Sequence, residues 1–301
     1  MLLVCVRKSP LSRIFSVALF VLLGASSLAA EPLPPHGGMP PGPEGRAEAY
    51  LAARQFEQAL QAYRGLVEKD PESSRAIRGR VRAYEGLGRR AAAETDLKER
   101  LKRHPSASAV NYGLGYLYYL EKRDAVAEER FQEAVRQNSA NALAWNNWGA
   151  LKIRTKSYTE AVEMVQRAIA LDPHNSMFYS NLYRVYQKLG DSGLFFAELR
   201  KHKAAGDEVR ARGYGKALAR DIRQQGFRLY AEGKTRAALE KFAQVVEVFK
   251  ASGDTGGQVA ALFGLGLLYE ELGDKAKAGE IYREVLVLSP GHLQAREKVE
   301  K

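Results

Sequence analysis

Cysteine is almost absent from this chain of 301 residues, in which Cys5 is the only one. A single cysteine excludes an intramolecular disulfide framework and a metal site built from several thiolates. The five histidines are also few, and no two of them have the spacing that would place two ligands on one face of a helix. The sequence therefore predicts no metal centre and no disulfide.

Sequence motifs of catalysis are missing as well. The chain has no glycine-rich phosphate loop and no G-x-S-x-G elbow. The stretch "GLGLLYEELG" contains Gly264 and Gly266, but both lie within an apolar helical run. Paired acids such as Glu128 and Glu129 are most simply read as facing solvent. We predict that the chain is not an enzyme, uses no cofactor and has no small-molecule substrate.

Long apolar runs are confined to the N-terminus. The run "IFSVALFVLLGA", Ile14–Ala25, follows the basic residues Arg7, Lys8 and Arg13 and precedes the small residues of "SSLAA". It is shorter than the roughly 20 residues that a membrane-spanning helix needs. This order predicts a cleaved signal peptide over residues 1–30 and a periplasmic or secreted mature protein. An uncleaved N-terminal anchor is the alternative, and membrane association is expected only in that case.

Basic residues outnumber acidic ones, 46 against 35, which gives a net charge of +11. The first thirty residues contribute three of these charges and contain no acid, so the remainder carries 11 − 3 = +8. An excess of this size fits either an ordinary solvated surface or a functional basic face, and both interpretations remain open.

The chain does contain an internal repeat of 34 residues. Alanines recur at this period, and so do residues that end a helix and large apolar residues; the aligned columns are Ala59, Ala93, Ala127 and Ala161, then Pro71, Pro105, Ser139 and Pro173, then Tyr63, Leu97, Phe131 and Val165. Four successive periods in one register indicate stacked structural units. Each unit would be a pair of antiparallel helices that cannot bury its apolar face alone.

These columns resemble the tetratricopeptide repeat family. Residues 142–175, for example, carry its pattern in Trp145, Trp148-Gly149, Ala161, Val165, Ala168 and Pro173, although Lys152 stands where the pattern has tyrosine. The resemblance implies an all-α fold, a right-handed α-solenoid of stacked helix-turn-helix 34-residue repeats. The predicted signal peptide and the Arg-rich and Ala-rich composition indicate an exported bacterial member of the family. In that pattern glycine and alanine allow two helices to approach closely, and the two tryptophans occupy interior positions.

The repeats also predict the domain organisation. The stretch "PLPPHGGMPPGPEG" holds six prolines and four glycines and reads as an irregular linker. Three glycines in "AAGDEVRARGYG" indicate a break after a degenerate repeat, and the six extra residues between Ala238 and Ala278 are expected near "FKASGDTGGQ", as a longer second helix or turn. The predicted parts are a signal peptide (1–30), a linker (31–45), an N-terminal array (46–209) and C-terminal repeats with a capping helix (210–301).

The resemblance further implies a concave groove lined by the first helices of successive repeats. Mapping the family's groove positions onto this sequence gives a basic and aromatic set: Arg75, Arg78, Arg82, Tyr112, Tyr116, Tyr119, Asn146, Arg154, Arg184 and Lys188. The alternative is that the tyrosines pack against a neighbouring repeat. Family members that hold peptide C-termini use a two-carboxylate clamp, of which this sequence has only fragments, so no clamp is predicted.

The function expected from these features is an exported scaffold or assembly factor in the cell envelope. The scaffold would bind a peptide segment of another protein, envelope or secreted, and the arginines favour a segment with acidic residues. The alternative is a basic α-solenoid that binds nucleic acid or another polyanion. The predicted export disfavours nucleic acid as the partner.

Overall fold

The computed structural model describes residues 42–300, which form fifteen α-helices and, within that range, no strand. These residues divide into two compact units, 42–192 and 193–300. None of the described helices is long and apolar enough to cross a bilayer. The predicted signal peptide and most of the predicted linker lie outside the described residues.

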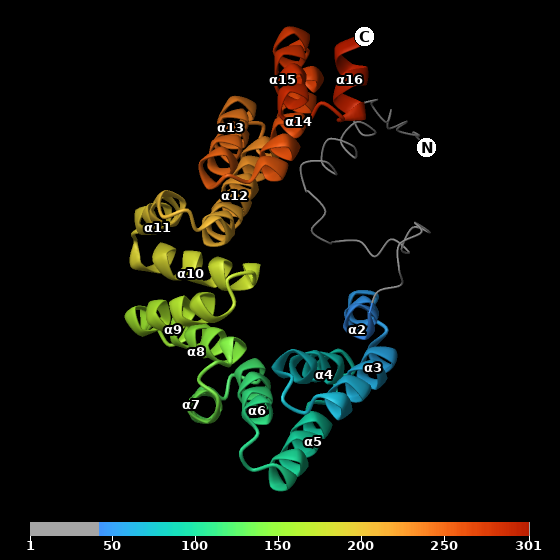
Figure 1. Ribbon diagram of the computed structural model, residues 1–301, viewed down its shortest axis with the longest axis vertical. Helices are drawn as coiled ribbons and strands as arrows, with labels where there is room; N and C mark the ends of the chain where they lie inside the picture. Colours follow the sequence, from blue (N-terminus) through green and yellow to red (C-terminus); the bar gives the residue numbers. More distant parts are fainter. Residues whose placement is uncertain (1–41, 301) are drawn as a thin grey trace, which may run out of the picture. The chain divides into compact units, whose positions relative to one another are not determined.

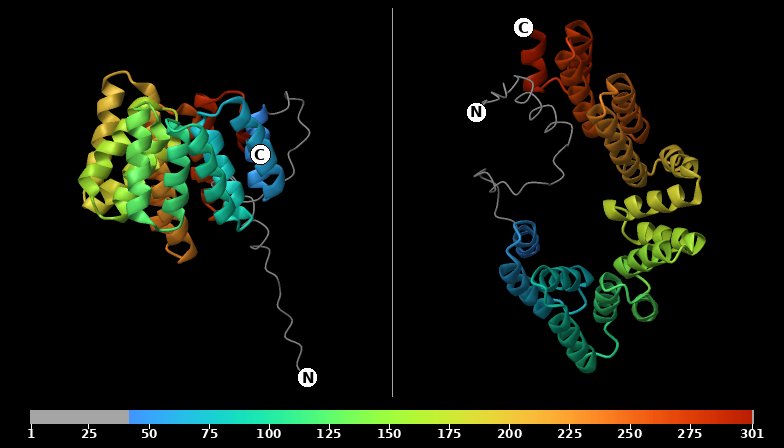
Figure 2. Two further views of the ribbon diagram at one scale, coloured as in Figure 1. Left: turned by 90° about the horizontal axis from the view of Figure 1, so that it is seen from below. Right: turned by 180° about the vertical axis from the view of Figure 1, so that it is seen from behind.

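In both units the helices follow one another as antiparallel pairs (Figure 1, Figure 2). The first unit contains α2 (Pro43–Ala52), α3 (Phe56–Lys69), α4 (Ser74–Gly86), α5 (Arg90–Arg103), α6 (Ser108–Leu120), α7 (Asp124–Gln137), α8 (Ala142–Arg154), α9 (Tyr158–Leu171) and α10 (Ser176–Leu189). The second contains α11 (Ser192–Ala204), α12 (Glu208–Ala231), α13 (Thr235–Ser252), α14 (Thr255–Glu271), α15 (Lys275–Leu288) and α16 (Leu293–Glu300). The predicted all-α fold of helix-turn-helix repeats is confirmed.

The 34-residue period is visible in the helix boundaries. Helices α4, α6, α8 and α10 begin at 74, 108, 142 and 176, and the second helices α3, α5, α7 and α9 begin at 56, 90, 124 and 158. The turn inside each pair also repeats, because a residue with positive φ stands at 54, 88, 122, 156 and 190. Each repeat therefore closes its helix pair with the same backbone conformation.

Small residues stand where the two helices of a pair meet, as the repeat pattern predicts. A β-carbon built at Gly115 would lie 2.7 Å from Cδ1 of Phe131, and one at Gly149 would lie 2.6 Å from Cγ2 of Val165. Ala161, which faces Gly149, is completely buried. A larger side chain at these positions would push the helices apart.

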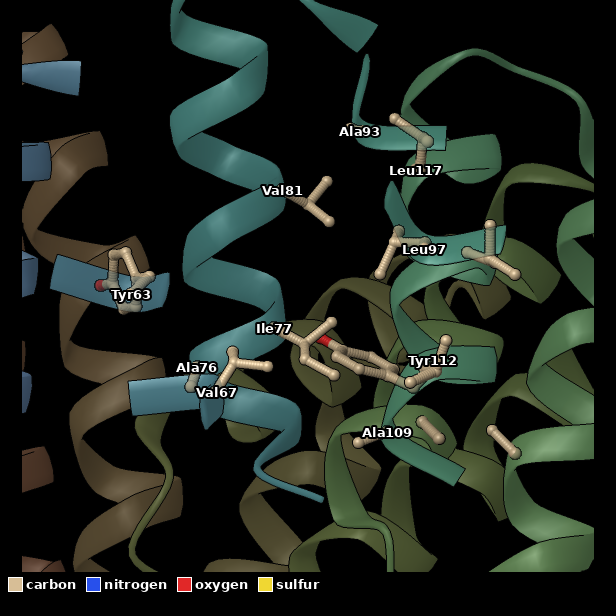
Figure 3. Close-up of a cluster of buried hydrophobic side chains, with 14 of the residues drawn as sticks. Tyr63, Val67, Ala76, Ile77, Val81, Ala93, Leu97, Ala109, Tyr112 and Leu117 are labelled. Carbon is tan, nitrogen blue, oxygen red and sulfur yellow. The ribbon is translucent and has the colours of Figure 1, made fainter. Parts of the chain in front are cut away.

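The apolar core of the first unit fills each helix pair and continues into the next pair. Ile77 and Val81 of α4 point toward Leu97 of α5 (Figure 3), and all three are buried. Since only neighbouring repeats contribute to such a core, the unit is held by a chain of similar local contacts.

Trp145 and Trp148, which were predicted to be core residues, pack against the core but are only half-buried, so the prediction is confirmed in part. Their rings stack with centroids 5.6 Å apart. The Trp145 indole N–H donates to the carbonyl oxygen of Ser139 (2.9 Å), and that of Trp148 donates to Oε1 of Glu128 (3.3 Å). An indole keeps a polar N–H that needs a partner, and here the partners lie near the surface.

Lys152, which replaces the tyrosine of the repeat pattern, forms ion pairs with two neighbouring helices. Its Nζ lies 2.7 Å from Oε1 of Glu128 on α7 and 2.8 Å from Oε2 of Glu160 on α9. The side chain is only 13% exposed, so this lysine stabilises the repeat by charge where the pattern has a phenol.

The predicted boundaries differ from the observed ones in two places. The two units part between residues 192 and 193, not at 209, because α12 runs unbroken for 24 residues through two of the glycines that suggested a break. At one of them, Gly215, an added β-carbon would lie 2.5 Å from the Ser252 side chain of α13, so glycine leaves room for this contact. Helix α2 already begins at Pro43, within the predicted linker, since proline is well tolerated in the first helical turn.

The six extra residues are accommodated by longer helices on both sides of a shorter turn. Helix α13 has 18 residues instead of the 14 of α9, and α14 has 17 instead of the 13 of α8. The turn between α13 and α14 shortens to Gly253 and Asp254. The prediction of a longer second helix is confirmed, and the lengthening of the following first helix was not anticipated.

Candidate functional site

The first helices α4, α6, α8 and α10 pack in series within the first unit. We call the surface that these four helices carry the inner face. All ten predicted groove residues lie on these helices. The structure therefore places all ten predicted residues on four helices packed in series, but their side chains differ in exposure and in partners.

A chain of buried hydrogen bonds runs through the inner face from one repeat to the next. Nδ2 of Asn147 donates to the Tyr112 hydroxyl (3.1 Å), and Nδ2 of Asn146 donates to Oδ1 of Asn147 (2.9 Å). Nδ2 of Asn181 donates to Oδ1 of Asn146 (2.8 Å), and the Arg184 guanidinium donates to Oδ1 of Asn181. Buried amides that satisfy one another in this way fix the positions of the helices that carry them.

Tyr112 and Asn146 are part of this chain and are completely buried. The expectation that they line an open groove is therefore wrong, because a ligand cannot reach them in this conformation. Burial raises the pKa of the Tyr112 hydroxyl, which stays uncharged. The two residues support the inner face from below.

Half-buried tyrosines on α6 stack with arginines from the neighbouring first helices. The Arg154 guanidinium lies 4.0 Å from the ring centroid of Tyr119, donates to that residue's carbonyl oxygen (2.8 Å) and forms an ion pair with Asp124. The Arg78 guanidinium lies 5.5 Å from the ring centroid of Tyr116. These cation–π contacts hold the guanidinium groups and the tyrosine rings in place at the inner face.

Two of the predicted basic residues are paired with acids of α2. Nη1 of Arg75 lies 3.8 Å from Oε2 of Glu44, and Nη1 of Arg82 lies 3.2 Å from Oε2 of Glu48. The inner face is thus less positive than the sequence suggested. The Arg184 and Lys188 side chains on α10 are exposed.

Arg78 has an unusual environment. Its Nη2 donates to the thioether sulfur of Met177 on α10 (3.3 Å), and its buried Nε has no partner. Burial lowers its pKa, but the neighbouring Tyr112 and Tyr116 hydroxyls outweigh this effect and raise it, so the guanidinium keeps its charge.

The buried amides Asn147 and Asn181 were not singled out from the sequence. They stand 34 residues apart, so a search for polar residues that recur at the repeat period would have found them. No such signal exists for the contact between Arg78 and Met177, because it joins residues 99 positions apart.

Two other hollows lie among the described residues. A pocket of 220 Å³ in the first unit is lined by Glu44, Glu48, Tyr63 and Arg75, among others. A pocket of 480 Å³ in the second unit has four charged residues in its lining: Glu270, Lys275, Arg283 and Lys298. Residues 42–300 hold no group of three or more histidine, cysteine and acidic side chains placed to bind a metal ion.

A family model described as "Tetratricopeptide repeat" matches residues 45–89, 78–129, 125–176 and 223–292, which is more than half of the chain. The chain belongs to the tetratricopeptide repeat family. The matched ranges cover α3 to α9 and α13 to α15, and the inner face is formed mainly by repeats that the family model recognises.

Individual relatives of the repeat protein are distant. The "Protein CTR9 homolog" of Arabidopsis thaliana is 21% identical over 83% of this chain and 26% of its own length. The "Type IV pilus assembly protein PilF" of Pseudomonas aeruginosa is 26% identical over 36% of this chain and 40% of its own length. The chain thus spans well under half of the length of either relative.

Solved structures of similar proteins include Pseudomonas aeruginosa PilF and the tetratricopeptide repeat protein YrrB. The PilF structure is 19% identical, with a TM-score of 0.39, and the match covers 86% of this chain and 96% of that one. The YrrB structure is 18% identical, with a TM-score of 0.34, and the match covers 81% of this chain and all of that one (100%). None of these similarities identifies a partner for the present chain.

Proposed function

We propose that this repeat protein is a protein-binding scaffold whose inner face holds an extended peptide segment of a partner. The observation that carries the proposal is the set of half-buried tyrosines and arginines on that face, fixed by stacking and by the buried amide chain beneath them. Aromatic and arginine side chains with restricted rotamers are the residues that contribute most to protein recognition. Membership of a family of stacked repeats supports the class of function, since stacking presents an extended surface.

A protein partner fits the inner face better than a polyanion does. A protein that binds nucleic acid neutralises many phosphates with unpaired lysines and arginines along its surface. On the inner face Arg75, Arg82 and Arg154 are already paired with carboxylates of this chain. The remaining positive charge suits single acidic residues of a peptide.

The place of action that we propose is the cell envelope. The support is the composition of residues 1–30, a basic segment followed by an apolar run and small residues. N-terminal sequencing of the protein from a periplasmic fraction tests this proposal. We expect a new N-terminus near Ala30 or Glu31, and protein confined to the cytoplasm with residue 1 intact would contradict export.

Site-specific cross-linking tests the binding face. A photoreactive amino acid is placed in living cells at 184 or 188 on α10, and as a matched control at 64 on α3 or 136 on α7, where the native arginines are 67% and 73% exposed. We expect covalent adducts with a protein from the α10 positions and none from the control positions. Adducts from the controls alone, or adducts with nucleic acid, would refute the proposed inner-face function.

A further inference from the structure

Four arginines of the first unit have a buried Nε without a hydrogen-bond partner: Arg78, Arg80, Arg130 and Arg154. In three of them another guanidinium nitrogen is bonded to oxygen, that of Asp96, Asn111 or Asp124. Among the described residues Arg78 has no such carboxylate or amide oxygen: its Nη2 donates to the sulfur of Met177, and its other hydrogen-bonding neighbour is the Tyr116 hydroxyl. A buried polar atom without a partner needs an explanation, and Arg78 is the case with the least compensation.

A thioether is a weak acceptor and leaves most of the donor capacity of a guanidinium unused. The other groups near Arg78 are the phenol side chains of Tyr112 and Tyr116. The Glu48 carboxylate also influences Arg78, but it accepts a hydrogen bond from Arg82. Arg78 is therefore a charged side chain, half-buried on the inner face, without a carboxylate of its own.

Nε and Nη2 form one edge of the Arg78 guanidinium, along which two parallel hydrogen bonds can be donated. The same edge binds a carboxylate elsewhere in this chain, since Arg136 donates to Glu133 from Nε (2.7 Å) and from Nη2 (2.5 Å). Such two-bond pairs are the strongest and most directional contacts that arginine makes with carboxylates. At Arg78 the Nη2 end of this edge donates to the Met177 sulfur, and the Nε end has no partner within residues 42–300.

We propose that Arg78 anchors an acidic side chain of the partner peptide, and that the incoming carboxylate displaces Met177 from the Nε–Nη2 edge. The inference rests on the proposed function and adds that the inner face prefers a peptide with an acidic side chain. Methionine has three rotatable side-chain bonds and can leave the edge at little cost. Stacking on Tyr116 keeps the guanidinium plane in place when it does.

The neighbouring structure is suited to this exchange. Tyr112, beside Arg78, is fixed by the hydrogen bond from Asn147, which belongs to the buried amide chain. The amide chain links α6, α8 and α10, so Met177 can swing away without loss of the helix contacts that hold α10.

The probe for this inference is a random library of acetylated, amidated decapeptides selected on the full chain. We expect selected peptides to carry glutamate or aspartate at one fixed position, and replacement of that residue by glutamine or asparagine to weaken binding about tenfold or more. Arg78→Gln should cause a similar loss. The matched variant is Arg82→Gln, one turn further along α4, where Glu48 already holds the guanidinium; it should change affinity by about twofold or less.

Two further variants test the charge preference and the displacement of Met177 separately. Arg78→Glu should bind peptides in which the acidic residue is replaced by lysine better than the original peptides. Met177→Leu, which keeps the volume but removes the sulfur, should bind acidic peptides as well as the native chain or more tightly. A tenfold loss in Met177→Leu would overturn the displacement step.

The outcomes separate the inference from the proposed function. Selected peptides that cross-link at 184 or 188 but show no acidic preference, or that bind Arg78→Gln unchanged, would overturn the role of Arg78 and leave inner-face binding intact. Peptides that cross-link only at the control positions would overturn inner-face binding itself. If Arg78→Gln unfolds, the comparison of acidic and amide peptides on the native chain decides the matter.

Discussion

At the scale of single residues, the distance between two helices of a repeat depends on one missing β-carbon. Gly149 lies against Cγ2 of Val165, and the carbonyl oxygen of Ala161 would be 3.3 Å from an added β-carbon. Neither neighbour can yield easily, because valine is stiff at χ1 and the second contact is backbone. This explains why the second helix of the repeat has alanine at a core position.

We expect Gly149→Ala to lower the free energy of unfolding by about 1–3 kcal/mol, since overpacking outweighs the gain in helix propensity. The matched control is Gly65→Ala in the middle of α3, where an added β-carbon would meet nothing within 4 Å. That change should stabilise the protein by up to about 1 kcal/mol. Thermal unfolding followed by circular dichroism compares the two, and equal midpoints would contradict the packing argument.

At the scale of elements, the turn inside each repeat places one residue in the left-handed region. Glycine takes this place at Gly88 and Gly190, but Arg54, Lys122 and Lys156 stand there with φ of 58°, 60° and 67°. A side chain is strained in this conformation because its β-carbon approaches the carbonyl oxygen. These three turns are therefore sites at which a substitution can stabilise the folded protein.

Lys122→Gly and Lys156→Gly should each raise the free energy of unfolding by about 0.5–1 kcal/mol, the relief of strain less the greater chain entropy of glycine. The reverse change, Gly88→Lys at φ +69°, should lower it by a similar amount. Urea unfolding of the three variants measures both effects. Destabilisation by the glycine substitutions would show that the lysine side chains make contacts that outweigh the strain.

The helix pairs could be predicted from the sequence because the residues that recur every 34 positions are those that pack the two helices of a repeat together. Every helix pair from α4 to α9 follows from columns of alanine, glycine and large apolar residues 34 positions apart. The glycines of α12 misled the prediction, since Gly215 is needed for contact with Ser252 and not for a turn. The local pattern does not distinguish these two uses of glycine.

The inner face was predictable as a set of helices but not as a set of exposed side chains. Tyr112 occupies a groove position of the family, yet it is buried, and its hydroxyl accepts a hydrogen bond from Asn147 of the next repeat. Such burial depends on partners from other repeats. The contact of Arg78 with Met177 is even less local, and only the three-dimensional arrangement shows it.

At the scale of the whole molecule, stability should be lost at alkaline pH. Burial raises the pKa values of Tyr63, Tyr112 and Tyr282, and hydrogen bonds to Glu128 and Glu160 raise the pKa of Lys152. Above about pH 10 the unfolded chain releases these protons while the folded chain keeps them. Because the unfolded state then binds fewer protons, stability falls as the pH rises.

We therefore expect the thermal midpoint to fall between pH 10 and pH 11, and Lys152→Met to reduce this fall. The control is Lys201→Met, whose native side chain is 70% exposed and pairs with Glu198 at 3.4 Å; it should leave the pH dependence unchanged. At the acid end, the Arg136 hydrogen bond lowers the pKa of Glu133, so that contribution disappears as the pH falls below about 4.5. A thermal midpoint that increases as the pH is raised above 10 would contradict the assignment.

The division into two compact units predicts that packing defects stay local. In a repeat protein each repeat is stabilised mainly by its neighbours, and distant substitutions act independently. Gly149 in the first unit has a counterpart in Gly266 of the second, where an added β-carbon would lie 2.5 Å from Cε1 of Tyr282. The same alanine substitution can therefore be made once in each unit.

Hydrogen exchange followed by mass spectrometry measures how far each defect spreads. Gly149→Ala should speed amide exchange about tenfold in the first unit and leave residues 193–300 unchanged, and Gly266→Ala should do the reverse. The double variant should show the sum of the two patterns. If either substitution speeds exchange equally in both units, the chain unfolds as one cooperative body, and a ligand on the inner face would then stabilise all of it and not the first unit alone.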